Sequence, residues 1–159
     1  MKARFPASVE IVDRRIQRTR EALREAMMEL MVERGWDAID VSALCDRANI
    51  GRSTFYQHYP NKEELLKANF VGLRDALLAQ VPSEVSAPGE LAFIPGLIAH
   101  VHEAQEVFRA LLNRRSGNYV QDRFRELLVE MMLVSMPGGK TRNWQSTARA
   151  HYLGGALFE

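Results

Sequence analysis

The sequence predicts an all-α protein. Apolar residues recur every three or four positions over most of the chain, as they do in amphipathic helices. No stretch shows a convincing strict alternation of apolar and polar residues, which a half-buried strand would show. The chain has 159 residues, of which 47% are apolar, so it can form one domain with a substantial core or two small domains.

The composition argues against a membrane or secreted protein. No apolar run approaches the ~18 residues that cross a bilayer. The N-terminus, MKARFPASVEIVDRR, lacks the apolar segment of a signal peptide. Cys45 is the only cysteine, so no internal disulfide can form, which fits a reducing compartment. We therefore expect a cytoplasmic protein with no membrane partner.

The first predicted element is a long amphipathic helix that begins between Ser8 and Arg18. Gly35 is expected to end it, because glycine readily adopts the left-handed conformation that follows many helices. The apolar face of this helix is formed by Leu23, Ala26, Met27, Leu30 and Met31.

A short helix is expected over residues 42–48, because apolar residues recur there at helical spacing. Asp40 or Ser42 can cap its N-terminus. Asn49 follows directly, and asparagine tolerates the left-handed conformation that a sharp turn between helices requires.

A second short helix is expected over residues 52–59, with Gly51 as its N-cap and Pro60 as its end. Asn61 can then cap a new helix that runs to about Gln80.

The remainder is predicted to be helical with two breaks. Residues 82–89 (PSEVSAPG) are typical of a linker, and residues 136–139 (MPGG) interrupt the chain again. A helical stretch, with a possible bend near Pro95 or Glu103, is expected over about 90–113, a further helix over 120–132, and a last one from about Arg142 to the end.

Two short helices joined by a three-residue turn, and supported by a longer helix, form a helix-turn-helix. In this motif the second helix enters the DNA major groove and reads bases with its N-terminal residues. On residues 52–59, Phe55 and Tyr59 share a face that can pack on the core. The remaining positions carry Arg52, Ser53 and Thr54 at the N-terminal end, and Tyr56 and His58 beside the buried face.

Local charge supports a phosphate partner, although the net charge is only +1. Lys62 begins the next helix, where its ammonium and the unpaired N–H groups can both bind phosphate. Further upstream, five arginines lie within eleven residues that contain a single acid, Glu21. A solvated helix face is the alternative explanation of this cluster. It consists of Arg14, Arg15, Arg18, Arg20 and Arg24.

Residues 19–66, TREALREAMMELMVERGWDAIDVSALCDRANIGRSTFYQHYPNKEELL, resemble the DNA-binding domain of the TetR family of bacterial transcriptional regulators. The run IGRSTFYQHYPNKEEL is similar to the turn and recognition helix of that family. The family often has glycine at the position of Asn49 and serine at that of Gly51. The resemblance implies a helix-turn-helix DNA-binding domain over residues 1–61 and an all-helical regulatory and dimerisation domain over residues 62–159.

The resemblance also implies a function, namely sequence-specific binding of double-stranded operator DNA by a homodimer, most simply as a repressor of transcription. The alternative is a DNA-binding factor outside transcription, such as the nucleoid-occlusion proteins built on the same scaffold. The implied DNA contacts are Arg18, Ser42, Arg52, Ser53, Thr54, Tyr56, His58 and Lys62.

A small-molecule effector is a further partner that the resemblance implies, because the second domain of the family commonly holds a pocket between its helices. Candidate lining residues are Phe70, Phe108 and Phe124. A helical bundle also needs such residues simply to pack.

We expect no metal, no cofactor and no enzyme activity. His100 and His102 are two positions apart, so on a helix they point about 200° away from each other and cannot share an ion. Cys45 lies on an apolar stripe and is expected to be a core residue. No serine elbow, phosphate loop or clustered carboxylate pair is present.

The last helix is apolar on two sides, so it needs two burial partners. One can be a helix of the same protomer, and the other is most simply the same helix of a second protomer, with a ligand wall as the alternative. Gly154 and Gly155 indicate close backbone approach. Because family chains usually continue into another helix, we expect either a naturally short protein or a missing C-terminal tail. The predicted dimer stripe is Trp144, Ala148, Tyr152 and Gly155, and the second stripe is Ala150, Leu153 and Leu157.

Overall fold

The computed structural model describes residues 7–81, 91–112, 117–135 and 143–158, and within these ranges it contains helices and no strands. The all-α prediction is confirmed. The chain divides into two compact units, Met1–Leu66 and Lys67–Glu159. This division falls inside a helix, whereas the sequence suggested a division between residues 61 and 62. The predicted linkers at 82–89 and 136–139 lie outside the described residues.

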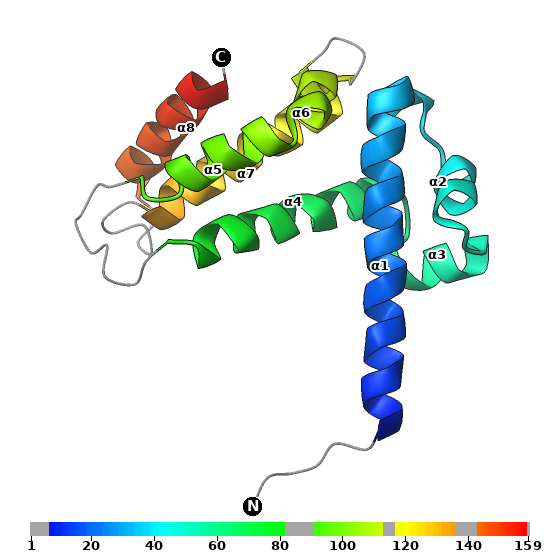
Figure 1. Cartoon of the computed structure of the whole chain (residues 1–159). Coiled ribbons are helices and arrows are strands. Elements are labelled where there is room, and N and C mark those ends of the chain that lie inside the picture. Colours follow the sequence, from blue (N-terminus) through cyan, green and yellow to red (C-terminus); the bar gives the residue numbers. More distant parts are fainter. Residues whose placement is uncertain (1–6, 82–90, 113–116, 136–142, 159) are drawn as a thin grey trace, which may run out of the picture. The chain divides into compact units, whose positions relative to one another are not determined.

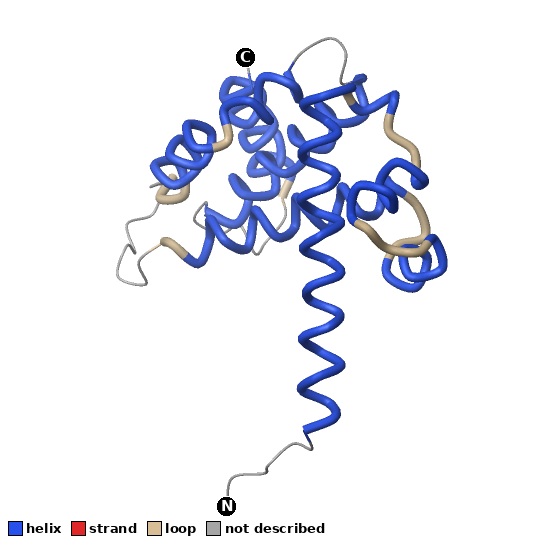
Figure 2. Tube along the Cα trace, turned by 45° about the vertical axis from the view of Figure 1, so that its right-hand side comes forward, coloured by secondary structure: helices blue, strands red, loops and turns tan. Residues whose placement is uncertain are grey.

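The first unit is organised around its long first helix. Its elements are α1 (Ala7–Arg34), the 3-10 turn η1 (Trp36–Ala38), α2 (Val41–Ala48), α3 (Arg52–His58) and the beginning of α4 (Lys62–Ala79). Figures 1 and 2 show α2 and α3 beside the C-terminal half of α1, while the N-terminal half of α1 extends beyond them. The core follows the predicted stripe, because Leu23, Met27 and Leu30 are at most 1% exposed.

The turn chemistry of this unit matches the sequence prediction. Asp40 is the N-cap of α2, and its side chain accepts a hydrogen bond from the amide of Ala43 at 2.7 Å. Asn49 adopts the left-handed conformation, with φ 51° and ψ 49°. Gly51 is the N-cap residue of α3. Asp40 thus fixes the start of α2, while Asn49 and Gly51 shape the three-residue turn between the two short helices.

The second unit contains the rest of α4 and four further helices: α5 (Ile94–Glu103), α6 (Gln105–Leu112), α7 (Gly117–Ser135) and α8 (Trp144–Phe158). The helical stretch predicted over 90–113 is two helices, which meet at Ala104 with φ −103° and ψ 30°, next to the second of the two predicted bend positions. Buried side chains of α7, among them Val120, Leu128, Met131 and Met132, form much of the core of this unit. No helix within the described residues is long and apolar enough to cross a membrane.

Helix α8 packs on α7 along one face only. Ala150 is fully buried, and a Cβ on Gly154 would lie 3.0 Å from Cγ2 of Val129. The predicted close approach at Gly154 is therefore made to α7 of the same protomer. The second predicted stripe is wrong at Leu157, which is 43% exposed, because Gly154 continues the face of Ala150 at helical spacing.

The predicted dimer stripe of α8 remains uncovered. Trp144 is 76% exposed and Tyr152 is 77% exposed, and Ala148 is exposed as well. A Cβ on Gly155 would meet no atom within 4 Å. The helix thus has one apolar face buried in its own unit and one apolar face without a partner in the described chain.

Candidate nucleic-acid interface

Helix α3 is anchored by one aromatic residue and exposes a polar surface. Phe55 is fully buried, and the rings of Tyr56 and Tyr59 lie 5.5 and 6.2 Å from it, centroid to centroid. Tyr56 is 57% exposed. Arg52 and Ser53 are exposed at the N-terminal end of the helix, and Thr54 and His58 are half-buried. The structure thus separates a packing face from a face that is free for a partner.

Two of the predicted contact residues touch each other. Nη2 of Arg52 donates a hydrogen bond to Oγ of Ser42 at 2.7 Å, which links the start of α3 to the start of α2. The remaining N–H groups of a guanidinium fork held in this way can face a base edge or a phosphate. Ser42 therefore lies where it can orient Arg52.

The electrostatics of this region favour an anionic partner. Between Asp46 and Glu63 the chain contains no acidic residue, and this stretch includes the whole of α3. A phosphate backbone can approach such a surface without meeting a carboxylate.

Arg47, by contrast, is engaged in structure. Its guanidinium binds Glu29 at 2.8 Å and Glu33 at 2.7 Å, and these two carboxylates of α1 raise its pKa above the ordinary value. The pairing ties α2 to α1 at the protein surface, so Arg47 is less available to a phosphate than Arg52.

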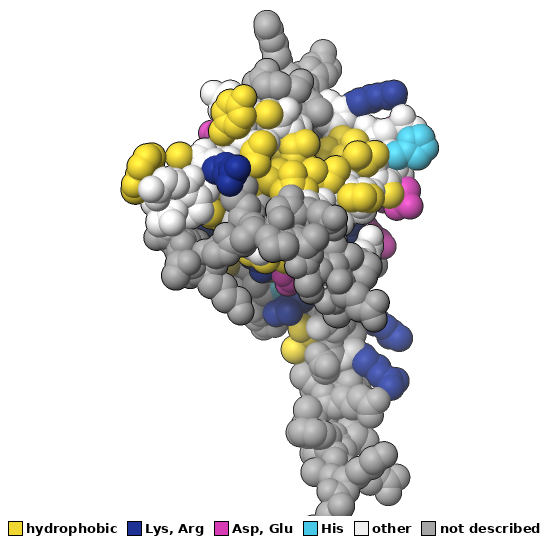
Figure 3. Space-filling model, turned by 90° about the vertical axis from the view of Figure 1, so that its left-hand side faces the viewer, with side chains coloured by type: hydrophobic (Ala, Val, Ile, Leu, Met, Phe, Trp, Pro, Cys, Tyr) yellow, Lys and Arg dark blue, Asp and Glu magenta, His cyan; other side chains and the backbone are white. Residues whose placement is uncertain are grey.

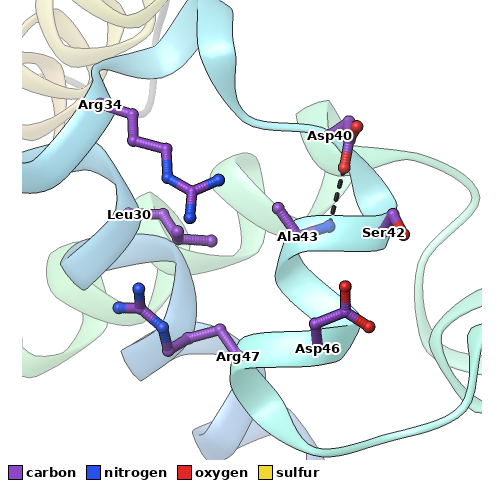
Figure 4. Close-up of a pocket in the computed structure, with 7 residues that line it drawn as sticks. All are labelled: Leu30, Arg34, Asp40, Ser42, Ala43, Asp46 and Arg47. Atoms are coloured by element: carbon purple, nitrogen blue, oxygen red, sulfur yellow. Dashed lines mark hydrogen bonds between the residues drawn. The ribbon is translucent and has the colours of Figure 1, made fainter.

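A polar hollow of about 310 Å³ lies between the end of α1 and α2. Figure 4 shows Leu30 and Arg34 on the α1 wall, and Asp40, Ser42, Ala43 and Asp46 on the α2 wall. Two arginines, Arg34 and Arg47, are balanced there by the two aspartates. This balance makes the hollow a poorer phosphate site than the acid-free surface of α3.

Arg20 is a basic residue near α3 that the sequence did not single out from its cluster. Burial and, secondly, the charge of Arg20 lower the pKa of His58. Burial raises the pKa of Tyr59, and Arg20 opposes that rise. Arg20 is exposed. Its positive charge therefore acts on the C-terminal end of α3, where a phosphate contact is predicted.

The helical repeat separates Arg20 from the predicted contact Arg18. Arg20 lies seven residues before the buried Met27, about 20° from it around the helix, whereas Arg18 lies nine residues before Met27, about 180° away. Of these two arginines, Arg20 lies on the face of α1 that packs on the rest of the unit, and Arg18 lies on the opposite face. The seven-residue spacing of Arg20 from Met27 was the signal in the sequence that could have identified it.

Lys62 makes contacts that the sequence did not indicate. Its Nζ donates hydrogen bonds to the carbonyl of Ile39 at 2.7 Å and to that of Trp36 at 3.1 Å. The same atom lies 4.3 Å from the centroid of the Trp36 ring. The ammonium expected to face phosphate is thus turned toward η1.

The predicted effector residues come together in the second unit. The ring of Phe124 lies 6.0 Å from that of Phe70 and 5.4 Å from that of Phe108, centroid to centroid. Phe108 and Phe124 are buried. Phe70 alone lines an adjacent groove of about 180 Å³, which is formed by Lys67, Phe70, Val71 and Arg74 of α4 and by Arg123, Glu126, Leu127 and Glu130 of α7.

The remaining candidates show no ligand-binding arrangement. The ring of His100 packs edge-on against Phe108 at 5.9 Å, and His102 is exposed. Among the described residues, no three histidine, cysteine or acidic side chains lie close enough to hold a metal ion. Cys45 is a buried free thiol whose pKa is raised by burial.

Comparison with known proteins agrees with this geometry. The family profile described as "Bacterial regulatory proteins, tetR family" matches residues 23–68, which contain the C-terminal part of α1, both short helices and the start of α4. The HTH-type transcriptional regulator YxbF of Bacillus subtilis, itself uncharacterized, is 47% identical over 57 residues, which are 35% of this chain and 15% of YxbF. Residues 23–68 therefore match the helix-turn-helix domain of TetR-type regulators.

Other TetR-type proteins extend the similarity. YdeS of Bacillus subtilis, a further uncharacterized HTH-type regulator, is 30% identical over 104 residues, which are 65% of this chain and 47% of YdeS. A tetR family transcription regulator from Shewanella sp. PV-4 has a similar fold, with a TM-score of 0.50 and 16% identity over 88% of this chain and 95% of that one. The chain spans less than half the length of the curated relatives it matches.

Proposed function

We propose that this protein is a member of the TetR family and a sequence-specific DNA-binding regulator of transcription, which acts in the cytoplasm as a homodimer on a palindromic operator, most simply as a repressor. The observation that carries the proposal is the α2–turn–α3 unit, in which Asn49 makes the turn and α3 exposes Arg52 and Ser53 on an acid-free surface. A helix presented in this way can enter the major groove.

The contacts divide into reading and positioning. Arg52 is the proposed base reader, because a guanidinium binds guanine in a bidentate manner. Ser53 and Thr54 lie beside it at the groove end of α3. Tyr56 and His58 are proposed phosphate contacts, and Arg20 adds one from α1. Arg18 and Ser42 are the other proposed contacts from the set that the resemblance implies. Lys62 belongs to that set as well, but its ammonium binds the carbonyls of Trp36 and Ile39.

The uncovered stripe of α8 is the proposed dimer contact. Figure 3 shows apolar side chains gathered over the helices that lie on the left in Figure 1. Trp144 and Tyr152, each more than three-quarters exposed, are the largest members of the stripe. A two-fold pairing of this face would bury them and would place two copies of α3 on one operator.

The groove between α4 and α7 is the proposed effector site. Phe70, Val71 and Leu127 give it an apolar surface, while Arg74 bridges it by an ion pair with Glu130 at 3.3 Å. A Val71→Trp substitution, at a lining residue that is 44% exposed, would fill the groove. In a screen of small molecules for release of the protein from DNA, this variant should keep DNA binding and lose the response. An unchanged response would place the effector elsewhere.

Selection of bound sequences from a random duplex library tests the function as a whole. We expect a palindrome whose half-sites are centred about 10 base pairs apart or a multiple of that, since the two copies of α3 must meet successive major grooves. Recovery of no common motif would contradict sequence-specific binding. Few genomic sites beside promoters would favour regulation, whereas many sites spread around the chromosome would favour a nucleoid-occlusion role.

A further inference from the structure

Lys62 is held at the junction between α4 and η1 by three interactions. Its single Nζ atom binds the carbonyls of Trp36 and Ile39, residues that lie 26 and 23 positions earlier in the chain. It also lies over the Trp36 ring. The side chain is partly buried, and Trp36 and Ile39 are only 4% and 2% exposed.

The carbonyl of Ile39 depends on the ammonium more than the carbonyl of Trp36 does. The carbonyl of Trp36 also accepts a bond from the amide of Ile39 at 3.1 Å, as the turn of η1 requires. Ile39 follows η1 in an extended conformation, where its carbonyl has no helical partner. Buried carbonyls without a donor are strongly disfavoured. Turning Lys62 outward to a phosphate would remove donors from both.

The contact closes a loop around the helix-turn-helix. Residues 39–61 leave η1, form α2 and α3, and return to α4, where Lys62 is the first residue. By binding η1, Lys62 fixes the start of α4 to the end of α1. The positions of α2 and α3, which lie between these two anchor points, are thereby restrained.

We propose that Lys62 is a positioning residue, which locks the recognition helix in its reading orientation through η1, and that it is not a phosphate contact. This inference rests on the proposed DNA-binding function. It predicts that Lys62 supports specific binding more than non-specific binding, since phosphate contacts support both alike.

The test compares Lys62→Met with Arg34→Met. Arg34→Met removes one positive charge from the same unit, at an exposed residue outside the proposed interface. The thermal midpoint of each variant is measured first, and the affinities for the selected duplex and a scrambled duplex are then measured well below that midpoint over a range of salt concentrations. Lys62→Met should lower the midpoint by about 3 to 8 °C.

In the folded Lys62→Met protein we expect a roughly tenfold loss of affinity for the selected duplex, with the affinity for the scrambled duplex and the salt slope unchanged. Arg34→Met should keep both affinities. Equal losses on both duplexes with a salt slope reduced by about one per protomer would show a phosphate contact and overturn the proposal. Two unchanged affinities, with only the midpoint lowered, would show a purely structural role and overturn it as well.

A second variant covers failure of Lys62→Met to fold. Lys62→Arg keeps the charge, and arginine is a good phosphate ligand, but no single guanidinium nitrogen can replace Nζ between the two carbonyls and the ring. Loss of affinity for the selected duplex is expected here too, and full affinity would overturn the proposal.

If the wild type binds no sequence selectively, the proposed function fails. Hydrogen exchange then tests separately whether the Lys62 contact restrains η1 and α2. If the backbone amides of η1 and α2 exchange faster in a Lys62 variant than in Arg34→Met, the Lys62 contact restrains these elements. Equal exchange rates in the two variants would contradict such a restraint.

Discussion

Nη2 of Arg52 lies 2.7 Å from Oγ of Ser42, so two residues from different helices share one hydrogen bond at the surface proposed to face DNA. The bond fixes one corner of the guanidinium and leaves its remaining donors to a partner. A side chain that is already oriented loses less conformational freedom on binding. The pair therefore links the fold of the helix-turn-helix to its proposed ability to read a base.

Arg52→Ala should weaken binding of the selected duplex by about 1 to 3 kcal/mol and relax the preference at one base pair in each half-site. Ser42→Ala should have a smaller effect of the same kind, and this effect should vanish in the Arg52→Ala background. A double-mutant cycle of duplex affinities measures both. Fully additive losses would instead indicate that Ser42 contacts DNA independently.

Arg20→Gln should lower the affinity for specific and scrambled duplexes alike and reduce the salt slope by about one per protomer, because it removes a proposed phosphate contact. Arg18→Gln is the matched control on the opposite face of α1 and should change the slope less. Affinities measured from low to physiological salt compare the two. A larger effect at Arg18 would reject the assignment of Arg20 and support the contact that the resemblance implies.

His58 should make DNA binding depend on pH. In the free protein, burial and Arg20 depress its pKa below the ordinary 6.5, so the imidazole is neutral at pH 7. A phosphate beside it would raise that pKa, and binding would then take up a proton. Wild-type affinity should rise as the pH falls from about 7.5 to 6, by less than tenfold per pH unit and protomer, and His58→Gln should abolish the rise. Equal pH profiles of the two proteins would exclude this role.

The same depressed pKa gives His58 an opposite effect on folding. Its contribution to stability is present above the unfolded-state pKa, about 6.5, and is lost as the pH falls through the lower folded-state pKa. Thermal midpoints between pH 5 and 7.5 should therefore fall more steeply for the wild type than for His58→Gln. This measurement needs no DNA.

Gly155→Trp should disrupt the proposed dimer and leave the protomer folded, because a side chain there meets no atom of its own unit. Gly154→Val should instead destabilise the protomer, since its Cβ would lie 3.0 Å from Cγ2 of Val129 and 3.3 Å from its backbone nitrogen. Sedimentation at micromolar concentration and circular dichroism separate the two effects. A monomeric wild type, or a Gly155→Trp protein that dimerises normally, would reject α8 as the interface.

Local chemistry explains which parts of the structure the sequence could predict. Asn49, Gly51 and Asp40 act through their own backbone neighbourhood, so the turn and the caps follow from residue type. The burial of Phe55 follows from helical periodicity within the seven residues of α3. These features determined the helix-turn-helix and the polar surface of α3.

Contacts between distant segments account for what the sequence did not predict. The partners of Lys62 lie more than twenty positions earlier. Helical spacing could place Arg20 on the packing face of α1, but not next to His58, which lies 38 positions later. At the end of the chain, periodicity indicated two apolar faces of α8 but not that Gly154, rather than Leu157, continues the buried one. Such relationships depend on how helices pack, which no local pattern contains.

The most direct test of sequence-specific reading by α3 is the ratio of affinities for the selected duplex and a scrambled duplex of equal length, measured at physiological salt. The account predicts a ratio of about 10³ or more for the wild type and a clearly lower ratio for Arg52→Ala. Equal binding of the two duplexes by the wild type, or an unchanged ratio in the variant, would contradict it.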